Sequence, residues 1–381
     1  MPSPEIPAPG ARGSDLTPAP KPSGPTTFHS DPSPGPTPDE AVDLVARMAT
    51  LFTPWALRTG VTLGLFDLVG TGLGAPALLA ERTGADKEAV RRLLRHLANL
   101  KLLDRGPDGY RLTALGAVLT SGHPSGLARG LDQSDAWAEA SDLAVPGLIS
   151  AVTTGRPSWS QAAGAPFWQS LATDPQLAAS FDTAMSGHAD AVGPWLATVW
   201  NWSTASHVAD VGGGTGSTLR DILVRHPHLQ GTLIDLPGTV SRAEAKLGGD
   251  AALAGRVTLS PGSFFDPLPD GHDILVLAHV LHDWGDDDCV RLLRRCAEAV
   301  ADGGAVLVVD RVVHDSAIEG QLPVSQRDLA MLVLLGGKER TAEEFRMLGK
   351  AAGLGLRRSP LAAPHEGLCL LEFGRDGGVD R

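Results

Sequence analysis

The feature that most constrains this chain is the alternation of short apolar segments with helical patterns after residue 206. The apolar segments are rich in β-branched residues, as are strands buried on both faces. The expected strands are 207–211, 231–235, 257–260, 273–278, 305–310 and 368–373. Helical patterns such as 218–225 and 287–301 separate them. This order predicts an α/β fold with a doubly wound, mostly parallel sheet, in which ligands bind beyond the carboxyl ends of the strands.

A glycine-rich run, residues 208–216, follows the first of these strands and opens a helix. Its glycines, which let the backbone turn tightly and approach a ligand, are Gly212, Gly214 and Gly216. Asp210 stands at the head of the run, and Asp235 ends the next strand. A carboxylate in that place can accept two hydrogen bonds from a ribose diol. The run therefore predicts a nucleoside cofactor at the strand ends.

The spacing of the glycines helps to decide between two candidate cofactors. A dinucleotide fingerprint needs a glycine at position 217, which holds Ser217. The observed spacing, Asp-x-Gly-x-Gly-x-Gly, resembles motif I of the class I methyltransferases that use S-adenosylmethionine. An acidic residue at its head also suits a cation better than a pyrophosphate. The motif favours S-adenosylmethionine over NAD and leaves open a glycine-rich turn without a ligand.

Four later segments extend this resemblance. Residues 235–237 read D-L-P, 262–265 read G-S-F-F, 282–284 read H-D-W, and 336–341 read G-G-K-E-R-T. Together they resemble the plant-type and bacterial small-molecule O-methyltransferases, above all the bacterial branch that modifies aromatic natural products, including antibiotics. The resemblance covers about residues 40–381. It implies a Rossmann-like, doubly wound methyltransferase sheet and an N-terminal winged-helix domain that forms a homodimer.

The resemblance also implies roles for individual residues. S-adenosylmethionine would contact Asp210, Gly212, Gly214, Gly216, Asp235, Leu236, Ser263 and Phe264. The pocket for a small aromatic substrate would include Trp168, Phe181, Met185, Asp283 and Met331. His282 would be the general base, flanked by Asp310 and Glu339. S-adenosylhomocysteine would be the product, and no metal would take part.

Three positions depart from the family pattern. Ser263 stands where an aspartate usually contacts the adenine amino group, so that hydrogen bond has less charge assistance. Ala278 stands where a lysine is common, and Asp310 replaces a longer glutamate. We expect the first two to alter the affinity or the pose of the cofactor and the third to keep its role.

His282 is the residue type that methyl transfer to a phenol needs. A phenol, with a pKa of about 10, is a poor nucleophile at neutral pH, and a histidine with a pKa of about 6.5 can take its proton. A carboxylate at the other ring nitrogen stabilises the imidazolium. The structural alternative is a histidine held by backbone at a strand–helix junction. His279, three residues earlier, is a second candidate without the H-D-W context.

Four acidic residues follow His282 closely: Asp283, Asp286, Asp287 and Asp288. Such a cluster could indicate a site for a divalent metal ion. They precede a helix, however, and acids are favoured in a first helical turn. We therefore expect no metal there. Thr341 and Glu344 form a T-x-x-E capping box, which predicts another helix start.

The segment before the sheet divides into a tail and a helical domain. Residues 1–38 hold 12 of the 29 prolines, which predicts a disordered tail. We expect a dimerisation domain over 39–158 and a catalytic domain over 159–381. Helices at 75–83 and 86–100, followed by strands at 102–104 and 110–112, give the outline of a winged helix. We expect Asp39 to cap the first helix and Pro54 to kink or divide it.

A winged helix can also bind DNA, but the charge of this chain argues against nucleic acid as a partner. The net charge is −12, from 32 basic and 44 acidic residues. No apolar run approaches the roughly 18 residues of a membrane span, and no secretory signal is visible at the N-terminus. Three cysteines without C-x-x-C spacing fit a reduced, cytoplasmic compartment.

Several functions stay open at this point. Methylation of an aromatic hydroxyl in natural-product biosynthesis is favoured. A phenolate can also react at its ortho carbon, so the same site could carry out C-methylation, or N-methylation of an amine. A transcription regulator with a vestigial cofactor fold and an NAD oxidoreductase are the alternatives from other classes.

Overall fold

The computed structural model describes residues 36–313, 322–358, 360–363 and 367–375. The chain divides into two units, Met1–Phe52 and Thr53–Arg381, which are described one at a time. The expected proline-rich tail lies outside the described residues except for its last three positions. Within the described ranges, no helix is both long and apolar enough to cross a bilayer.

The first unit contains α1 (Pro38–Ala49) and the start of α2 (Phe52–Thr62). Thr37 caps α1, because its hydroxyl accepts a hydrogen bond from the Glu40 amide and the Glu40 carboxylate accepts one from the Thr37 amide. The expectation that Asp39 caps this helix is therefore wrong. Pro38 already occupies the first helical turn, where its missing N–H costs nothing. The helix does divide before Pro54, which lies in the first turn of α2.

The second unit opens with the winged-helix outline that the sequence predicts. Its elements are α3 (Leu65–Gly70), α4 (Pro76–Thr83), α5 (Lys87–Asn99), β1 (Leu103–Gly106), β2 (Gly109–Leu112) and α6 (Ala114–Ala117). Gly84 ends α4 in the left-handed conformation, and Asp86 caps α5. Strands β1 and β2 pair antiparallel. Leu79, Leu94 and Leu97 are fully buried and form the centre of this small core.

Short helices follow and carry many of the aromatic residues. They are α7 (Ala136–Ala144), α8 (Leu148–Thr154), α9 (Trp159–Ala163), α10 (Phe167–Thr173) and the long α11 (Pro175–Val199). Trp159 and Phe167 are buried and belong to one core cluster. Trp168 and Phe181 are only partly buried and remain available to a ligand.

The sheet has the predicted doubly wound topology. Its strands are β3 (His207–Val211), β4 (Gln230–Asp235), β5 (Val257–Pro261), β6 (His272–Ala278), β7 (Val300–Val313), β8 (Arg340–Thr341), β9 (Leu354–Leu356), β10 (Leu361–Ala362) and β11 (Leu368–Arg375). The order is β10-β11-β7-β6-β3-β4-β5, with β8 on β7 and β9 on β11. Strands β3 to β7 run parallel and β11 runs antiparallel to β7. From β3 the chain adds β4 and β5 on one side and then crosses over to add β6 and β7 on the other side. A ligand site is expected at this switch point between β3 and β6.

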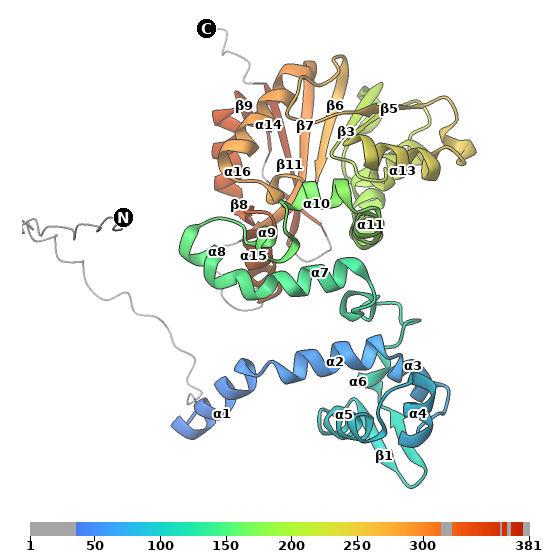
Figure 1. The fold of residues 1–381 in the computed structure, drawn as a ribbon. Helices are drawn as coiled ribbons and strands as arrows, with labels where there is room; N and C mark the ends of the chain where they lie inside the picture. The colour runs from blue at the N-terminus through green and yellow to red at the C-terminus, as the bar shows by residue number, and fades with distance from the viewer. Residues whose placement is uncertain (1–35, 314–321, 359, 364–366, 376–381) are drawn as a thin grey trace, which may run out of the picture. The chain divides into compact units, whose positions relative to one another are not determined.

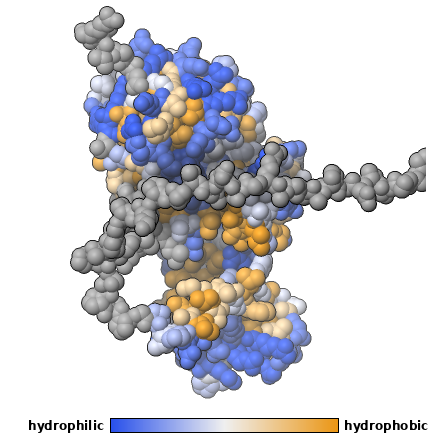
Figure 2. Space-filling view, turned by 90° about the vertical axis from the view of Figure 1, so that its left-hand side faces the viewer, coloured by the Kyte–Doolittle hydropathy of each residue, from blue (hydrophilic) through white to orange (hydrophobic). Residues whose placement is uncertain are grey.

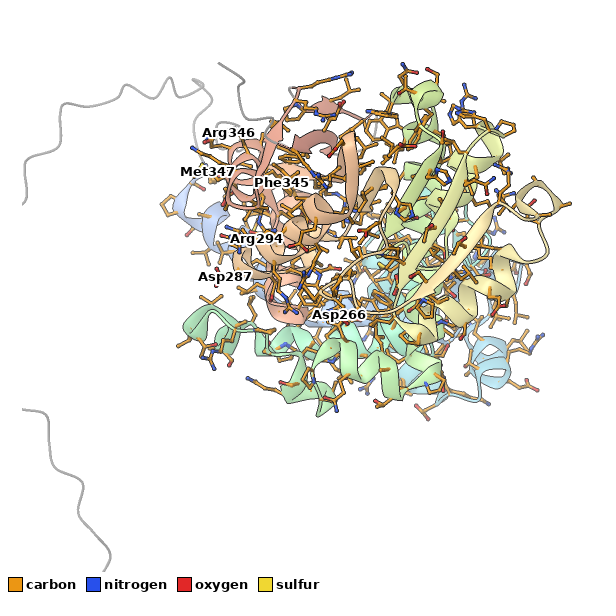
Figure 3. The ribbon with its side chains drawn as sticks, turned by 90° about the horizontal axis from the view of Figure 1, so that it is seen from above. Asp266, Asp287, Arg294, Phe345, Arg346 and Met347 are labelled. Carbon is orange, nitrogen blue, oxygen red and sulfur yellow. The ribbon has the colours of Figure 1, made fainter. Side chains whose placement is uncertain are left out.

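Helices cover both faces of this sheet (Figure 1). With α11, helices α12 (Ser217–Arg225) and α13 (Pro237–Leu247) cover one face and pack on alternate strand residues such as Val208 and Val276. On the other face, α14 (Asp286–Ala299) and α16 (Ala342–Ala351) pack on Val211 and Leu277. Seen from above, Phe345, Arg346 and Met347 of α16 lie near Arg294 of α14 (Figure 3), whose guanidinium donates to the Ala351 carbonyl at 3.0 Å. Helix α15 (Leu322–Leu334) precedes β8.

Apolar side chains also gather at the surface (Figure 2). On the second unit, the exposed large apolar residues include Trp55 of α2, Leu143 of α7, and Ile149 and Val152 of α8. All three cysteines are buried and unpaired.

Candidate active site

The glycine-rich loop lies between β3 and α12. Gly212 has a φ of 71°, in the left-handed region that favours glycine. A Cβ on Gly212 would lie 3.0 Å from Val280 and 3.3 Å from the ring of Phe264. The loop therefore closely approaches the turn after β6 and the predicted adenine-contacting ring. The fold therefore brings Gly212 and Phe264, two of the residues predicted to contact the cofactor, next to each other.

Two carboxylates, the buried Asp210 and the partly buried Asp235, stand near the ends of neighbouring strands. Burial raises the pKa of Asp210 to about 7, and the charge of Asp235 adds to the rise. Neither carboxylate oxygen of Asp210 has a hydrogen-bond partner of good geometry among the described residues. Asp235 accepts hydrogen bonds from the Gly214 amide at 2.9 Å and from the Leu236 amide at 2.7 Å. Burial raises its pKa as well.

This arrangement fits S-adenosylmethionine better than a dinucleotide. Two carboxylates beside the loop, one buried beneath it and one at the end of β4, favour a cation over a pyrophosphate. Asp235 is only partly buried, so its carboxylate is the one of the two that a ligand can reach, whereas Asp210 lies beneath the loop. Ser263 is partly used within its own turn, because its hydroxyl accepts a hydrogen bond from the Phe265 amide at 3.2 Å.

His282 lies between three carboxylates. Its Nδ1 is 3.4 Å from Oδ1 of Asp310 and 3.4 Å from Oε1 of Glu339. Its Nε2 is 3.4 Å from Oδ1 of Asp283. The side chains of Asp310 and Glu339 are fully buried, and that of His282 is 11% exposed. The predicted base and its acidic partners therefore meet, although they come from three separate parts of the chain.

The charges of these carboxylates control the protonation of His282. Burial by itself lowers the pKa of His282, but Asp310, Asp283 and Glu339 outweigh burial and raise it to about 9. Burial raises the pKa of Asp283 to about 7 and also raises that of Asp310. With no acceptor bound, the imidazole is therefore protonated at neutral pH.

Backbone contacts hold His282 in place. The His279 amide donates to the Val309 carbonyl at 2.9 Å, which continues the pairing of β6 with β7 by one residue. His279 then takes a left-handed backbone with a φ of 55°, and a short 3-10 turn (Leu281–Asp283) follows. His279 and His282 therefore do not begin one helical turn. The His282 amide donates to Oδ2 of Asp310 at 3.3 Å.

Arg340 is a site residue that the sequence analysis missed. Its guanidinium is fully buried and donates to the carbonyls of Leu281 at 2.8 Å and Trp284 at 2.7 Å, and to Asp286 at 2.8 Å. It therefore holds both ends of the H-D-W turn. Gly337 completes this contact, because a Cβ there would lie 2.0 Å from the His282 carbonyl. An arginine within a G-G-K-E-R-T segment was the only local signal.

Together with His279, the residues His282 and Asp310 form a group of side chains that could bind a divalent metal ion. His279, His282 and Asp310 each offer a ligand atom, and these atoms lie within 4.8 Å of one another. The same Asp310 oxygen already serves as a charge partner of the His282 ring. The expectation that no metal takes part stays a prediction.

Aromatic rings gather around Trp284, two residues after His282. The ring of Trp168 stacks on that of Trp284 at 5.8 Å and 11°, and Phe181 lies edge-on to Trp168 at 6.4 Å. Phe264 lies edge-on to Trp284 at 5.8 Å. The predicted pocket residues Met185 and Met331 are half-buried on α11 and α15, and their place in the pocket stays a prediction.

Comparisons with known proteins agree with this geometry. Residues 146–355 match the model of an O-methyltransferase domain, and residues 47–122 match that of an O-methyltransferase dimerisation domain. The chain is 40% identical to aclacinomycin 10-hydroxylase RdmB of Streptomyces purpurascens, covering 86% of this chain and 89% of that protein. It is also 40% identical to 2,7-dihydroxy-5-methyl-1-naphthoate 7-O-methyltransferase of Streptomyces carzinostaticus, covering 81% and 92%.

A solved structure is similar over almost its full length. It is the O-methyltransferase NcsB1 from neocarzinostatin biosynthesis, in complex with S-adenosylmethionine and 2-hydroxy-5-methyl naphthoic acid. The TM-score is 0.78 and the identity 38%, covering 86% of this chain and 98% of that one.

Proposed function

This chain belongs to the O-methyltransferase family, and from that premise we propose that it methylates a phenolic hydroxyl of a small aromatic natural product, with His282 as general base. The resemblance expected from the sequence is confirmed, and so are the enzyme class and the use of S-adenosylmethionine. The observation that carries the proposal is the buried His282 ring, with a carboxylate 3.4 Å from each of its nitrogens.

The division of labour between cofactor and protein follows from the chemistry. S-adenosylmethionine, when bound, supplies a methyl group that its sulfonium already activates. Asp235 would hold it beside the glycine loop that Asp210 shapes, and the aromatic rings around Trp284 would orient the acceptor and exclude water. What the protein must still do is remove a proton from the acceptor oxygen.

His282 performs that step at Nε2. The neutral imidazole takes the phenolic proton, and Asp310 and Glu339 at Nδ1 stabilise the imidazolium that forms. A base with a pKa of about 9 is close in strength to a phenolate, whose conjugate acid has a pKa of about 10. Proton transfer between the two is therefore nearly balanced. General base catalysis of this kind contributes about 10²- to 10⁴-fold.

The choice of an aromatic acceptor is supported by relatives and by the site. Relatives include methyltransferases named for naphthoate, mitomycin and aminohydroxybenzoate substrates. The partly buried rings of Trp168 and Phe181 offer apolar surface of the kind on which a flat acceptor packs.

Three other outcomes compete and can be separated in one assay. C-methylation and N-methylation would use the same site, and hydroxylation is the activity for which RdmB is named. The purified enzyme is incubated with S-adenosylmethionine and, in parallel, with a hydroxynaphthoate or with an aminohydroxybenzoate, whose amine could be N-methylated, and each product is analysed by mass spectrometry and NMR. We expect the mass of one added methylene and a methoxy signal. A ring-methyl signal, an N-methyl signal or the mass of one added oxygen would each overturn the assignment.

We further propose that the chain acts as a homodimer. It matches the O-methyltransferase dimerisation model over 47–122, and exposed apolar residues on α7 and α8 are of the kind that interfaces cover. Light scattering coupled to size-exclusion chromatography should give twice the mass of the chain. A monomeric mass at micromolar concentration would contradict this.

A further inference from the structure

Two polar links join α11 to α13 across the glycine loop. In the first, the carboxylate of Asp182 on α11 pairs with the guanidinium of Arg242 on α13. In the second, the hydroxyl of Ser186 lies 3.4 Å from that of Thr215, to which Lys246 donates at 3.2 Å. We call the Asp182–Arg242 pair the clasp.

The clasp is more than a pair of mobile surface charges. The side chain of Asp182 is 14% exposed and that of Arg242 is 35% exposed. Arg242 also donates to the Gly238 carbonyl at 3.0 Å and to the Thr239 hydroxyl at 3.3 Å. Its guanidinium is therefore held on the first turn of α13 and loses little side-chain freedom when it meets Asp182.

The position of the clasp relates it to the cofactor. Helix α13 begins two residues after Asp235, the carboxylate expected to bind the ribose. Asp182 follows Phe181, a predicted pocket residue, and its charge is close enough to raise the pKa of Asp235. The clasp therefore connects the strand end that holds the cofactor with the helix that faces the acceptor.

We propose that Asp182 and Arg242 are positioning residues that hold α11 over bound S-adenosylmethionine and thereby set its affinity. The pair acts through α11 and α13 and does not take part in methyl transfer. The proposal rests on the use of S-adenosylmethionine and not on the role of His282. Opening the clasp frees α11 to move from the cofactor, so the cofactor dissociates more easily while the chemistry at His282 is unchanged.

The experiment compares Arg242→Ala, Asp182→Ala and the exchanged double variant Asp182→Arg/Arg242→Asp with the full-length parent enzyme. Affinity for S-adenosylmethionine is measured by calorimetry, and kcat and KM are measured with saturating acceptor. We expect each single variant to weaken binding and raise KM by about tenfold, with kcat within about twofold, as a partly buried ion pair would predict. We expect the double variant to recover most of the lost affinity.

A matched control is Arg220→Ala, which breaks the 2.9 Å pair between Arg220 of α12 and Asp250, a residue that follows α13. It should leave the affinity and kcat unchanged, and an equal loss of affinity would overturn a specific role for the clasp. Unchanged affinity in both single variants, or a fall in kcat alone, would also overturn it. If the exchanged double variant binds S-adenosylmethionine no more tightly than the single variants, the ion pair is not what sets the affinity. His282→Ala, run in parallel, should bind the cofactor normally, so failure of the general-base proposal would be seen separately.

Discussion

The carboxylate of Asp310 meets His282 twice. Its Oδ2 accepts the His282 backbone N–H at 3.3 Å, and its Oδ1 lies 3.4 Å from the ring Nδ1. Asp310 is fully buried, so both contacts operate in a medium of low polarity. One side chain therefore fixes the position of the histidine and stabilises positive charge on its ring.

The pH dependence of the reaction should report the protonation of His282. Its pKa is raised to about 9, so between pH 6 and 9 most of the free enzyme holds a protonated ring that cannot accept a proton. We expect kcat/KM to rise by up to about tenfold per pH unit across this range and to level off above pH 9. Rates measured across pH 6–10 check this, and a flat profile would show that no base of this pKa is needed.

Replacing Asp310 should move that profile. In Asp310→Asn, the largest influence that raises the pKa of His282 is lost, so the midpoint should fall toward the ordinary value of about 6.5. The plateau rate should fall as well, because the neutral amide stabilises the imidazolium less. A profile with an unchanged midpoint would mean that Asp310 does not control the ring.

Removal of the base should slow turnover but leave cofactor binding intact. We expect His282→Ala to lower kcat by at least about tenfold, with calorimetry showing unchanged affinity for S-adenosylmethionine. A suitable control is His279→Asn, because asparagine tolerates the left-handed backbone found there. If His279→Asn loses as much activity as His282→Ala, the assignment of the base is wrong.

The carboxylate of Asp235 should matter for binding and not for chemistry. In Asp235→Asn, one oxygen remains to accept the Gly214 amide, so the loop is kept while the charge is lost. We expect about ten- to hundredfold weaker binding of S-adenosylmethionine, the cost of one or two charge-assisted hydrogen bonds. Equal affinity for parent and variant by calorimetry would put the ribose elsewhere.

Arg340 should be important for stability. In Arg340→Met, two carbonyls of the H-D-W turn lose their donors in a buried place, which should cost about 2–4 kcal/mol in the free energy of unfolding. Urea denaturation measures this. The comparison is Arg346→Met, which breaks the exposed Arg346–Glu343 pair on α16 and should leave the denaturation midpoint unchanged. Equal midpoints for the two variants would contradict the buried role.

Local patterns predicted the elements of the fold well. In the large sheet, β3 has the predicted bounds and the other five predicted strands lie within observed ones, because apolar β-branched runs between glycine turns carry their own signal. The N-cap of α1 was misplaced by two residues, since Thr37, Asp39 and the proline between them give competing local signals. The capping box of Thr341 and Glu344 is confirmed.

The sequence by itself determined the glycine loop, the succession of strands and helices along the chain and the residue types of the candidate site, because each depends on neighbours a few positions away. Only the tertiary structure decided which charges meet. Asp310, Glu339 and His282 come together through the pairing of β6 with β7 and of β7 with β8, and Asp182 reaches Arg242 across 60 residues. Such contacts depend on the packing of distant elements in low dielectric. No local pattern records how buried a charge is or which partner it finds.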